Sequence, residues 1–478
     1  MGQLDADVII IGAGTSGGAV ARELRRSRPD LSVIVIEAGS RVSAGSAPDS
    51  DTERVITSGF NWDYHYDSGF RSKGVYPTGK LLGGSSAING ALAFYPTSAD
   101  WNDAGLTGYV DFEMDTGDWL VGRSQIAYGA WTELDALDTA FVEWAEVSLS
   151  AQLLDRGHRY PDDGESALFL IGRNVERGRR INSFSWTESA SPALRIETGR
   201  CVQAIREQQN FVEVASRDGQ VLTAKHAFVT AGVIGSPALL QRSGLLARCL
   251  ADGNAIGGFK DHPTFVLWCP MTDMGFERWS GRWRQVGLTT TSEHSAGAML
   301  GLLKGVSPTT IPRARDAGYR QPMVGIACML HNCDVRGWVD VCEGQDPVLT
   351  WEPGESPTVV SQVGSYLPLL LDIAAVLRAK GLVGEPFLWN KAFLSNSGLQ
   401  RAMLSAAIQP GWHGVSTLSL DRAVMEKGLL NQIAAVSGSK LITVCDASII
   451  PDLPKIPTNL LVSKMAALIT KAVANEIQ

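Results

Sequence analysis

The sequence lacks several features that mark secreted, membrane-spanning or nucleic-acid-binding proteins. Its seven cysteines are odd in number and form no C-x-x-C pair, which favours reduced thiols and predicts a cytoplasmic protein. No basic and apolar segment typical of a signal peptide precedes the first apolar strand, so we expect no secretion signal. Acidic residues (50) exceed basic ones (42), which argues against nucleic acid as a partner. No cysteine or histidine spacing indicates a metal site, and we expect none.

Long apolar runs are also missing. The longest candidate, residues 366–377, contains Pro368 and Asp372, so we expect a buried or amphipathic helix and no transmembrane segment. A hydrophobic fraction of 45% is nevertheless ample for a large core, and 478 residues predict two or three domains of ~150 residues each.

The most informative stretch is residues 7–39, where an apolar strand at 8–11 is followed by glycines at G-x-G-x-x-G spacing. Residues 19–28 favour a helix, and a second apolar strand at 31–36 ends on Glu37. In such an arrangement Gly12 allows a tight turn, Gly14 lets the backbone approach a pyrophosphate, and Gly17 packs the helix on the strand. Glu37 stands where an acid accepts hydrogen bonds from a ribose. The stretch predicts a dinucleotide site, and NAD and FAD both fit it.

Further along the chain, residues 40–75 are rich in Ser, Gly and Asp and are expected to form a loop. Strand-like alternation covers residues 179–232, and within it a buried strand that begins at Ala227 runs into a glycine-rich turn. A further buried strand at 441–446 and a helix at 458–477 close the sequence. The return of such strands predicts a dinucleotide domain that is interrupted and later resumed.

Several stretches resemble one family, and they do so in that family's order. Residues 79–90 (GKLLGGSSAING) and 230–240 (TAGVIGSPALL) are similar to the two signatures of the glucose–methanol–choline (GMC) oxidoreductases, which are FAD-dependent alcohol oxidases and dehydrogenases. Residues 260–263 (KDHP) and 446–451 (DASIIP) resemble further elements of that family. The resemblance implies FAD as the cofactor. It also implies an α/β fold in which a Rossmann-like FAD-binding domain is joined by an α+β substrate-binding domain built on a β-sheet.

The expected FAD-binding domain comprises residues 1–100, 195–262 and 411–478, and the substrate-binding domain comprises 101–194 and 263–410. Carried over by resemblance, the residues expected to bind FAD are Gly12, Gly14, Thr15, Ser16, Gly17, Glu37, Ala38, Gly84, Ser86, Asn89, Gly90, Ala91, Val202, Trp412, Asp446, Ala447 and Thr458.

Oxidation of an alcohol needs a base for the hydroxyl proton, and a neutral histidine suits this task near pH 7. Of the seven histidines, His413 stands in the stretch QPGWHGVST, which resembles the family's H-P-V-G-T with Gly414 in place of proline. The resemblance implies that His413 is the catalytic base, while His262 matches a structural element.

The sequence departs from the family on the substrate side. The family has a second His or Asn before the final Pro-Thr, whereas here the loop PDLPKIPT at 451–458 is shorter and contains neither. Lys455 and Asn459 are the nearest polar candidates. A Tyr95-Pro96 pair also replaces the Arg-Gly that follows the family's first signature.

The expected function is oxidation of a CH–OH group in a small, bulky or aromatic alcohol, because tryptophans are frequent in residues 263–410. The electron acceptor is left open between O₂, a quinone and a redox protein. Two alternatives remain: a specialised flavoenzyme with lyase or biosynthetic tailoring chemistry, and a flavin-binding subunit without turnover.

Overall fold

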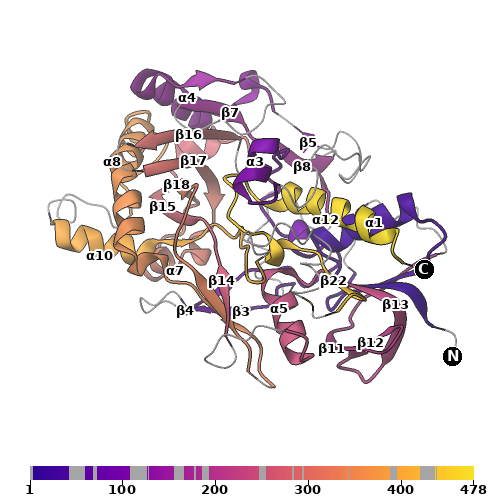
Figure 1. The fold of residues 1–478 in the computed structure, drawn as a ribbon. Coiled ribbons are helices and arrows are strands. Elements are labelled where there is room, and N and C mark those ends of the chain that lie inside the picture. The colour runs from indigo at the N-terminus through magenta and orange to yellow at the C-terminus, as the bar shows by residue number, and fades with distance from the viewer. Residues whose placement is uncertain are drawn as a thin grey trace.

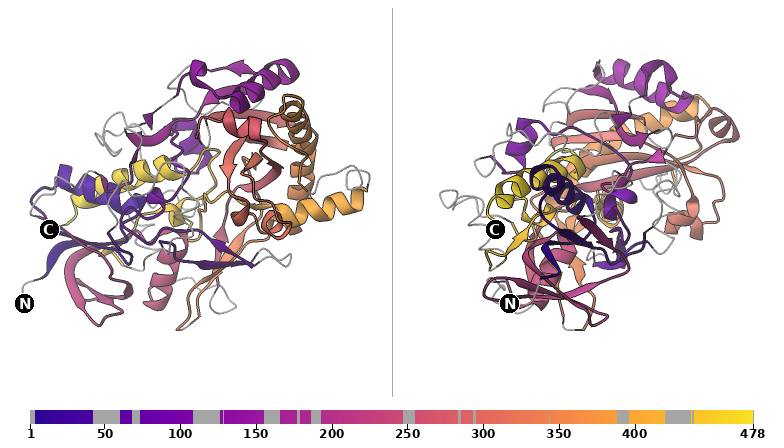
Figure 2. Two further views of the ribbon diagram at one scale, coloured as in Figure 1. Left: turned by 180° about the vertical axis from the view of Figure 1, so that it is seen from behind. Right: turned by 90° about the vertical axis from the view of Figure 1, so that its right-hand side faces the viewer.

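The computed structural model describes residues 4–41, 60–67, 73–107, 126–127, 129–154, 166–176, 179–185, 193–246, 255–282, 285–292, 295–342, 344–387, 396–419, 437 and 439–477. Sheets built from distant parts of the chain organise it (Figure 1). The two chain ends lie on the same side of the molecule, beside the first sheet (Figures 1 and 2).

The first sheet carries the strands expected from the glycine-rich start. In spatial order it contains β10 (Leu194–Glu197), β2 (Val33–Ile36), β1 (Ala6–Ile11), β13 (Val221–Val229), β12 (Val212–Ser216) and β11 (Val202–Glu207), and β22 (Ile442–Val444) also pairs with β13. Strands β10, β2, β1, β13 and β22 are parallel, whereas β12 and β11 are antiparallel additions. Strand β22 joins this sheet after a long insertion, which confirms that this fold unit is discontinuous in sequence.

Helices α1 (Thr15–Ser27) and α12 (Asn459–Ala474) pack against each other beside this sheet (Figure 1). Helix α1 begins directly after Gly14, four residues earlier than the sequence pattern suggested, because a turn of small residues continues straight into it. Helix α5 (Gly232–Arg242) begins after the glycine-rich turn that follows β13.

A second sheet joins β14 (Ala255–Phe259), β19 (Gly337–Asp340), β20 (Val348–Thr350), β3 (Tyr64–Asp67) and β4 (Lys73–Tyr76). The expectation of a loop at 40–75 is wrong for β3 and β4. Strand β3 pairs in parallel with β20, about 280 residues away, so the pairing that makes it a strand comes from a partner that local composition does not reveal. Residues 42–59 and 68–72 lie outside the described part of the chain.

A third sheet carries the substrate-side part of the fold. Its spatial order is β21 (Gln409–Pro410), β15 (Pro263–Pro270), β18 (Met323–Leu330), β17 (Ser295–Val306), β16 (Val286–Ser292), β7 (Ala167–Leu170) and β6 (Gln152–Leu153). A small sheet of β5 (Ile126–Ala127), β8 (Arg173–Glu176) and β9 (Arg179–Arg180) lies nearby. In the described part of the chain the remaining α-helices are α3 (Ser98–Asp103), α4 (Ala136–Leu149), α6 (Asp273–Glu277), α7 (Pro312–Asp316), α8 (Pro357–Ala379) and α10 (Ser397–Ala407).

Helix α8 is the one described helix that is long and apolar enough to cross a membrane by length and composition alone. It packs against β15, β18, α4 and α10, and its inward side chains include Tyr366, Leu370 and Ile373, which are fully buried. This packing resembles that of a core helix covering a sheet, as Figure 1 shows.

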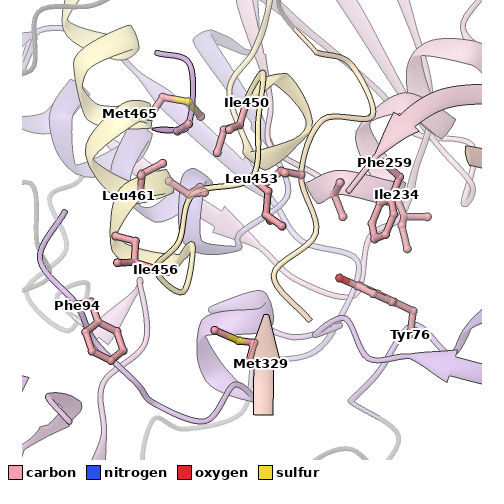
Figure 3. Packing of buried hydrophobic residues seen from close by; sticks show 14 of the residues in the cluster. Tyr76, Phe94, Ile234, Phe259, Met329, Ile450, Leu453, Ile456, Leu461 and Met465 are labelled. Atoms are coloured by element: carbon pink, nitrogen blue, oxygen red, sulfur yellow. The ribbon is translucent and has the colours of Figure 1, made fainter. Parts of the chain in front are cut away.

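The sheets share one hydrophobic core. Tyr76 of β4, Phe259 of β14, Met329 of β18 and Ile456 and Leu461 near the C-terminus all belong to it (Figure 3). The mixed α/β fold with a Rossmann-like sheet is therefore confirmed. The exact domain limits stay a prediction, and the second sheet combines strands from both expected domains.

Candidate functional site

A cavity of about 680 Å³ lies where the parallel strands of the first sheet end. Gly12, Glu37, Thr230 and Asp446 line it, and they follow β1, β2, β13 and β22 respectively. The opposite wall comes from β15, β17 and β18 of the third sheet. The carboxyl edge of a parallel sheet is where open α/β folds bind their ligands.

Glycines shape the first end of this cavity. Gly12 has φ 101°, and a Cβ there would lie 2.6 Å from the carbonyl oxygen of Thr230. A Cβ on Gly84 would lie 2.6 Å from the Cα of Gly14, so the two glycine-rich segments touch through their backbones. At Gly14 itself a Cβ would meet no described atom within 4 Å, although this residue lines the cavity. The backbone segments around Gly12, Gly14 and Gly84 form a glycine cradle. It leaves room beside Gly14, where no described side chain caps the N-terminus of α1. Such a helix terminus binds phosphate.

Glu37 provides the carboxylate at this end. Its Oε2 accepts from the backbone N–H of Ala13 at 2.9 Å, and its Oε1 accepts from Gly39 at 2.8 Å. Burial raises the pKa of Glu37 to about 6, although the N–H groups of Gly39 and Ala13 oppose the rise. The backbone N–H of Ala38 also favours the ionised carboxylate, which leaves part of its hydrogen-bonding capacity for a hydroxyl group of a ribose.

We expect the affinity of the apoprotein for FAD to depend on this pKa. Ribose hydroxyls donate to the ionised Glu37, so FAD binds the ionised form and its dissociation constant should rise about tenfold per pH unit below pH 6. The folded pKa lies above the unfolded one, so in the apoprotein the contribution of Glu37 to stability is present below pH 4.5 and is lost as the pH rises through 6. Flavin fluorescence titrations from pH 5 to 8 measure the affinity. Glu37→Gln should bind more weakly and show no such step, and an equal step in both proteins would contradict the assignment.

The second glycine-rich segment is held by buried polar contacts. Ser86 donates to the carbonyl of Gly83, and Ser183 donates to the carbonyl of Gly14 at 2.8 Å. Asn89 lines the cavity, and its Oδ1 accepts from the backbone N–H of Ala91 at 2.8 Å and from Arg180 at 2.9 Å. These bonds use the amide oxygen of Asn89 and leave its Nδ2 donors for a ligand.

Both carboxylate oxygens of Asp446 accept hydrogen bonds from neighbouring protein groups. Its Oδ2 accepts from the backbone of Gly232 at 2.9 Å and from Ser236 Oγ at 2.5 Å, while its Oδ1 accepts from Ser448. It therefore joins β22 to the start of α5, and both ends of this link face the cavity. We expect it to fix the backbone around a ligand rather than to accept a proton.

His413 lies on the cavity wall in the segment that follows β21. Trp412 before it has φ 66°, and Gly414 after it donates its N–H to the Tyr76 hydroxyl at 3.0 Å. That hydroxyl donates to Asp261 Oδ2 at 2.7 Å, and Asp261 Oδ1 accepts from the N–H of His413 at 3.0 Å. A fully buried carboxylate and a tyrosine thus hold the backbone on both sides of the histidine. Burial raises the pKa of Asp261 to about 6, although its hydrogen bonds favour the ionised form.

His262 stands behind His413. The two rings meet edge to face with centroids 5.3 Å apart, and His262 Nδ1 lies 2.8 Å from the carbonyl oxygen of Leu330. Burial holds the pKa of His262 well below its usual range, so this ring is neutral and adds no positive charge beside His413. Its position is consistent with the structural role expected for it.

The shortened C-terminal loop is fixed by ion pairs. Lys260 Nζ lies 2.6 Å from Asp452, and Lys455 Nζ lies 3.3 Å from Asp103 at the end of α3. Lys455 is not among the residues that line the cavity, whereas Asn459 is, and Asn459 Oδ1 accepts from the Thr15 hydroxyl at 3.0 Å. Asn459 thereby ties the start of α12 to the start of α1.

Removing the charge of Lys455 should therefore have a small effect. In Lys455→Met we expect the rate at which an alcohol reduces the bound flavin to stay within about threefold of the parent rate. The free energy of unfolding should fall by no more than ~1 kcal/mol, because the ion pair of Lys455 is partly exposed. Stopped-flow absorbance and thermal unfolding measure the two quantities. A loss of flavin reduction as large as that of a His413 variant would instead make Lys455 a catalytic group.

The cavity brings most of the expected site residues together. Those that line it are Gly12, Gly14, Thr15, Ser16, Glu37, Ala38, Gly84, Asn89, Gly90, Val202, Trp412, His413, Asp446, Ala447, Thr458 and Asn459. Gly17, Ser86, Ala91 and Lys455 are outside this lining. Gly17 is a packing residue, since a Cβ there would lie 2.0 Å from the carbonyl oxygen of Gly12.

A dinucleotide fits the glycine cradle, the uncapped N-terminus of α1 and the Glu37 carboxylate that can accept from a ribose. The same cavity extends beyond them to His413. The family model described as FAD dependent oxidoreductase (DAO) matches residues 7–250, just over half of the chain. The chain belongs to this family. FAD is its cofactor, and the protein is an FAD-dependent oxidoreductase.

Comparison with individual proteins confirms the GMC resemblance. An uncharacterised GMC-type oxidoreductase of Rhodococcus erythropolis is 29% identical over 305 residues, which span 55% of this chain and 59% of that protein. The 5-(hydroxymethyl)furfural oxidase of Methylovorus sp. is 23% identical over 98% of this chain and 99% of its own length. The crystal structure of pyridoxine 4-oxidase from Mesorbium loti shares the fold, with a TM-score of 0.77 at 18% identity, covering 98% of this chain and 99% of that one.

Sequence reasoning missed several residues that shape the site, among them Tyr76, Asp261 and Arg180. Asp261 stands in the KDHP element that carried the resemblance, but nothing local indicated that its side chain holds the His413 segment. The replacement of proline by Gly414 was the available signal, because a glycine N–H needs a partner that proline does not.

Proposed function

We propose that this protein oxidises a neutral, apolar alcohol to a carbonyl compound, with His413 as the base. The proposal rests on one observation: His413 lines the same cavity as the glycine cradle and an apolar wall. The hydroxyl proton of the substrate passes to the imidazole, and a positioned base of this kind contributes ~10²–10⁴-fold to the rate. When bound, FAD supplies the acceptor for the hydride that leaves the carbinol carbon.

The residues that would hold FAD follow the cavity from end to end. Gly14 and the start of α1 would face the pyrophosphate, and Glu37 would accept from the ribose. Val202 would face the adenine, and Asn89, Gly90, Ala447 and Thr458 would lie along the remainder. Each of these residues lines the cavity.

The substrate wall favours a bulky apolar or aromatic alcohol. Trp268, Leu303 and Met329 line it, with Thr264 and Gln409 as its polar members near His413. The described lining residues of β15, β17, β18 and β21 include no charged side chain. An alcohol bearing a carboxylate or an ammonium group would therefore lose its hydration without gaining an ion pair.

An anaerobic panel of aliphatic, aromatic, sugar and amino alcohols tests the proposal. Apolar and aromatic alcohols should bleach the oxidised flavin absorption, and readmitted O₂ should restore it if O₂ is the acceptor. Recovery only with a quinone or a redox protein would identify a dehydrogenase. Bound flavin that no alcohol bleaches would contradict the proposal and favour lyase or tailoring chemistry, or a subunit without turnover. A cytoplasmic location stays a prediction from the cysteine pattern.

A further inference from the structure

We propose that the substrate site is a channel along β15 that selects alcohols by length, and that the pair Trp268–Gly325 sets the selected length. The inference rests on the proposed function, because it places the hydroxyl group at His413. The preferred substrate class is an uncharged alcohol whose carbinol carbon is separated by a short hydrocarbon spacer from a terminal apolar or aromatic group.

The channel wall follows from the alternation of side chains along one strand. Thr264, Val266 and Trp268 of β15 all line the cavity. Phe265 and Leu267, on the other face of the same strand, are fully buried, and α8 packs against β15. Because side chains on one face recur every second residue, the three lining residues form a continuous row.

The near end of this row lies at His413. Strand β21 pairs with the start of β15, so that Thr264 lies opposite Gln409. Gly411 is close to the same point, since a Cβ there would lie 3.2 Å from Thr264 Oγ1. Trp268 stands four residues farther along β15, which at ~3.3 Å per residue places it about 13 Å from Thr264. That span suits an alcohol longer than benzyl alcohol.

The far end is set by a glycine. Gly325 of β18 is the cross-strand partner of Trp268. A Cβ on Gly325 would lie 2.7 Å from Cζ3 of the Trp268 ring and 2.7 Å from Cγ1 of Val266. The indole therefore lies across the backbone of its partner, in space that any side chain at 325 would occupy. Cross-strand partners project to the same face, so a methyl group at 325 would push the ring into the channel.

The inference predicts opposite effects from two substitutions. Trp268→Ala lengthens the channel and should move the preferred substrate to a longer alcohol, whereas Gly325→Ala shortens it and should move the preference to a shorter one. We expect at least a tenfold change in kcat/KM for the alcohol that the parent prefers, since one or two methylene groups in an apolar pocket are worth about that much.

The experiment uses the FAD-loaded protein and ω-phenyl alcohols from benzyl alcohol to 5-phenylpentan-1-ol, with anaerobic flavin reduction as the first readout. The second readout is the affinity for the matching ω-phenyl amides, which have no CH–OH group, measured by perturbation of the flavin absorption. Matched controls are Trp338→Ala, an exposed tryptophan on β19, and Gly364→Ala on α8, where a Cβ would meet only Leu404 at 3.4 Å.

Opposite shifts of the preferred length in the two variants, with none in the controls, support the channel. Any other pattern overturns it, including a preference that neither variant moves. The amide readout separates this result from the proposed function. If no alcohol bleaches the flavin but the amides show opposite shifts, the oxidation proposal fails and the channel stands. If alcohols bleach the flavin without a length dependence, the channel proposal fails and the oxidation proposal stands.

Discussion

Replacing His413 with alanine should slow reduction of the bound flavin by the best alcohol about 10²–10⁴-fold. The variant lacks an acceptor for the hydroxyl proton at the point where the cavity meets the apolar wall. The backbone that carries residue 413 is held by Asp261 and Tyr76 through the main chain, so the loss should be chemical rather than structural. Stopped-flow absorbance under anaerobic conditions measures the rate.

The controls separate loss of the base from loss of the fold. The variant should bind FAD as the parent does, because the described contacts of the glycine-rich segments are made by Thr230, Gly14, Gly83 and Ser183 rather than by the imidazole. Added imidazole should restore part of the rate. The restored rate should rise with pH as the concentration of unprotonated imidazole rises. His65→Ala replaces an exposed histidine of β3 outside the cavity and should behave as the parent. Equal rates for His413→Ala and the parent would remove His413 from the mechanism.

The nucleotide end of the site could be predicted from sequence because its signals are local. Gly12, Gly14 and Glu37 lie within one strand–turn–helix–strand unit, and each acts through backbone geometry or a single side chain. The turn at Gly12 needs a positive φ, and the packing of α1 needs no side chain at Gly17. These requirements appear in the sequence as glycines at fixed spacing.

The network around His413 could not be predicted because its members are far apart in sequence. Tyr76, Asp261 and Gly414 meet only after the second sheet, the third sheet and the segment after β21 have packed together. The same is true of Arg180 and Asn89, which are 91 residues apart. A lysine in a short loop, Lys455, drew attention by its position in sequence, while its carboxylate partner lies on α3, in a distant part of the chain.

The tryptophans show how composition informs only in part. Their frequency favoured a bulky or aromatic alcohol as the substrate, and Trp268 does line the cavity. Trp351 is instead fully buried in the core, where its ring meets Phe259 edge to face, and Trp338 is exposed on β19. Composition therefore predicted the type of residue, but the register of β15 against β18 decides which one faces the substrate.

The second large effect is expected from restoring the proline that the related pattern has at position 414. Gly414→Pro removes the N–H that donates to Tyr76, and a Cβ there would lie 2.6 Å from Cε2 of Phe259 and 2.7 Å from the Tyr76 oxygen. Both effects displace the backbone next to His413. A misplacement of about 1 Å costs up to ~10²-fold in rate, so flavin reduction should fall by that factor. FAD should remain bound, as its absorption spectrum will report.

Tyr76→Phe tests the same link from the other side without adding atoms. It leaves the buried N–H of Gly414 and the carboxylate of Asp261 each short of one partner, which should lower stability by ~1–3 kcal/mol and the rate about tenfold. Both substitutions remove the same hydrogen bond, and Tyr76→Phe also removes the oxygen that a side chain at position 414 would strike. The double variant should therefore lose less than the sum of the single losses. Strictly additive losses would mean that the Tyr76–Gly414 contact does not position His413, and that Gly414→Pro acts only through its clash with Phe259.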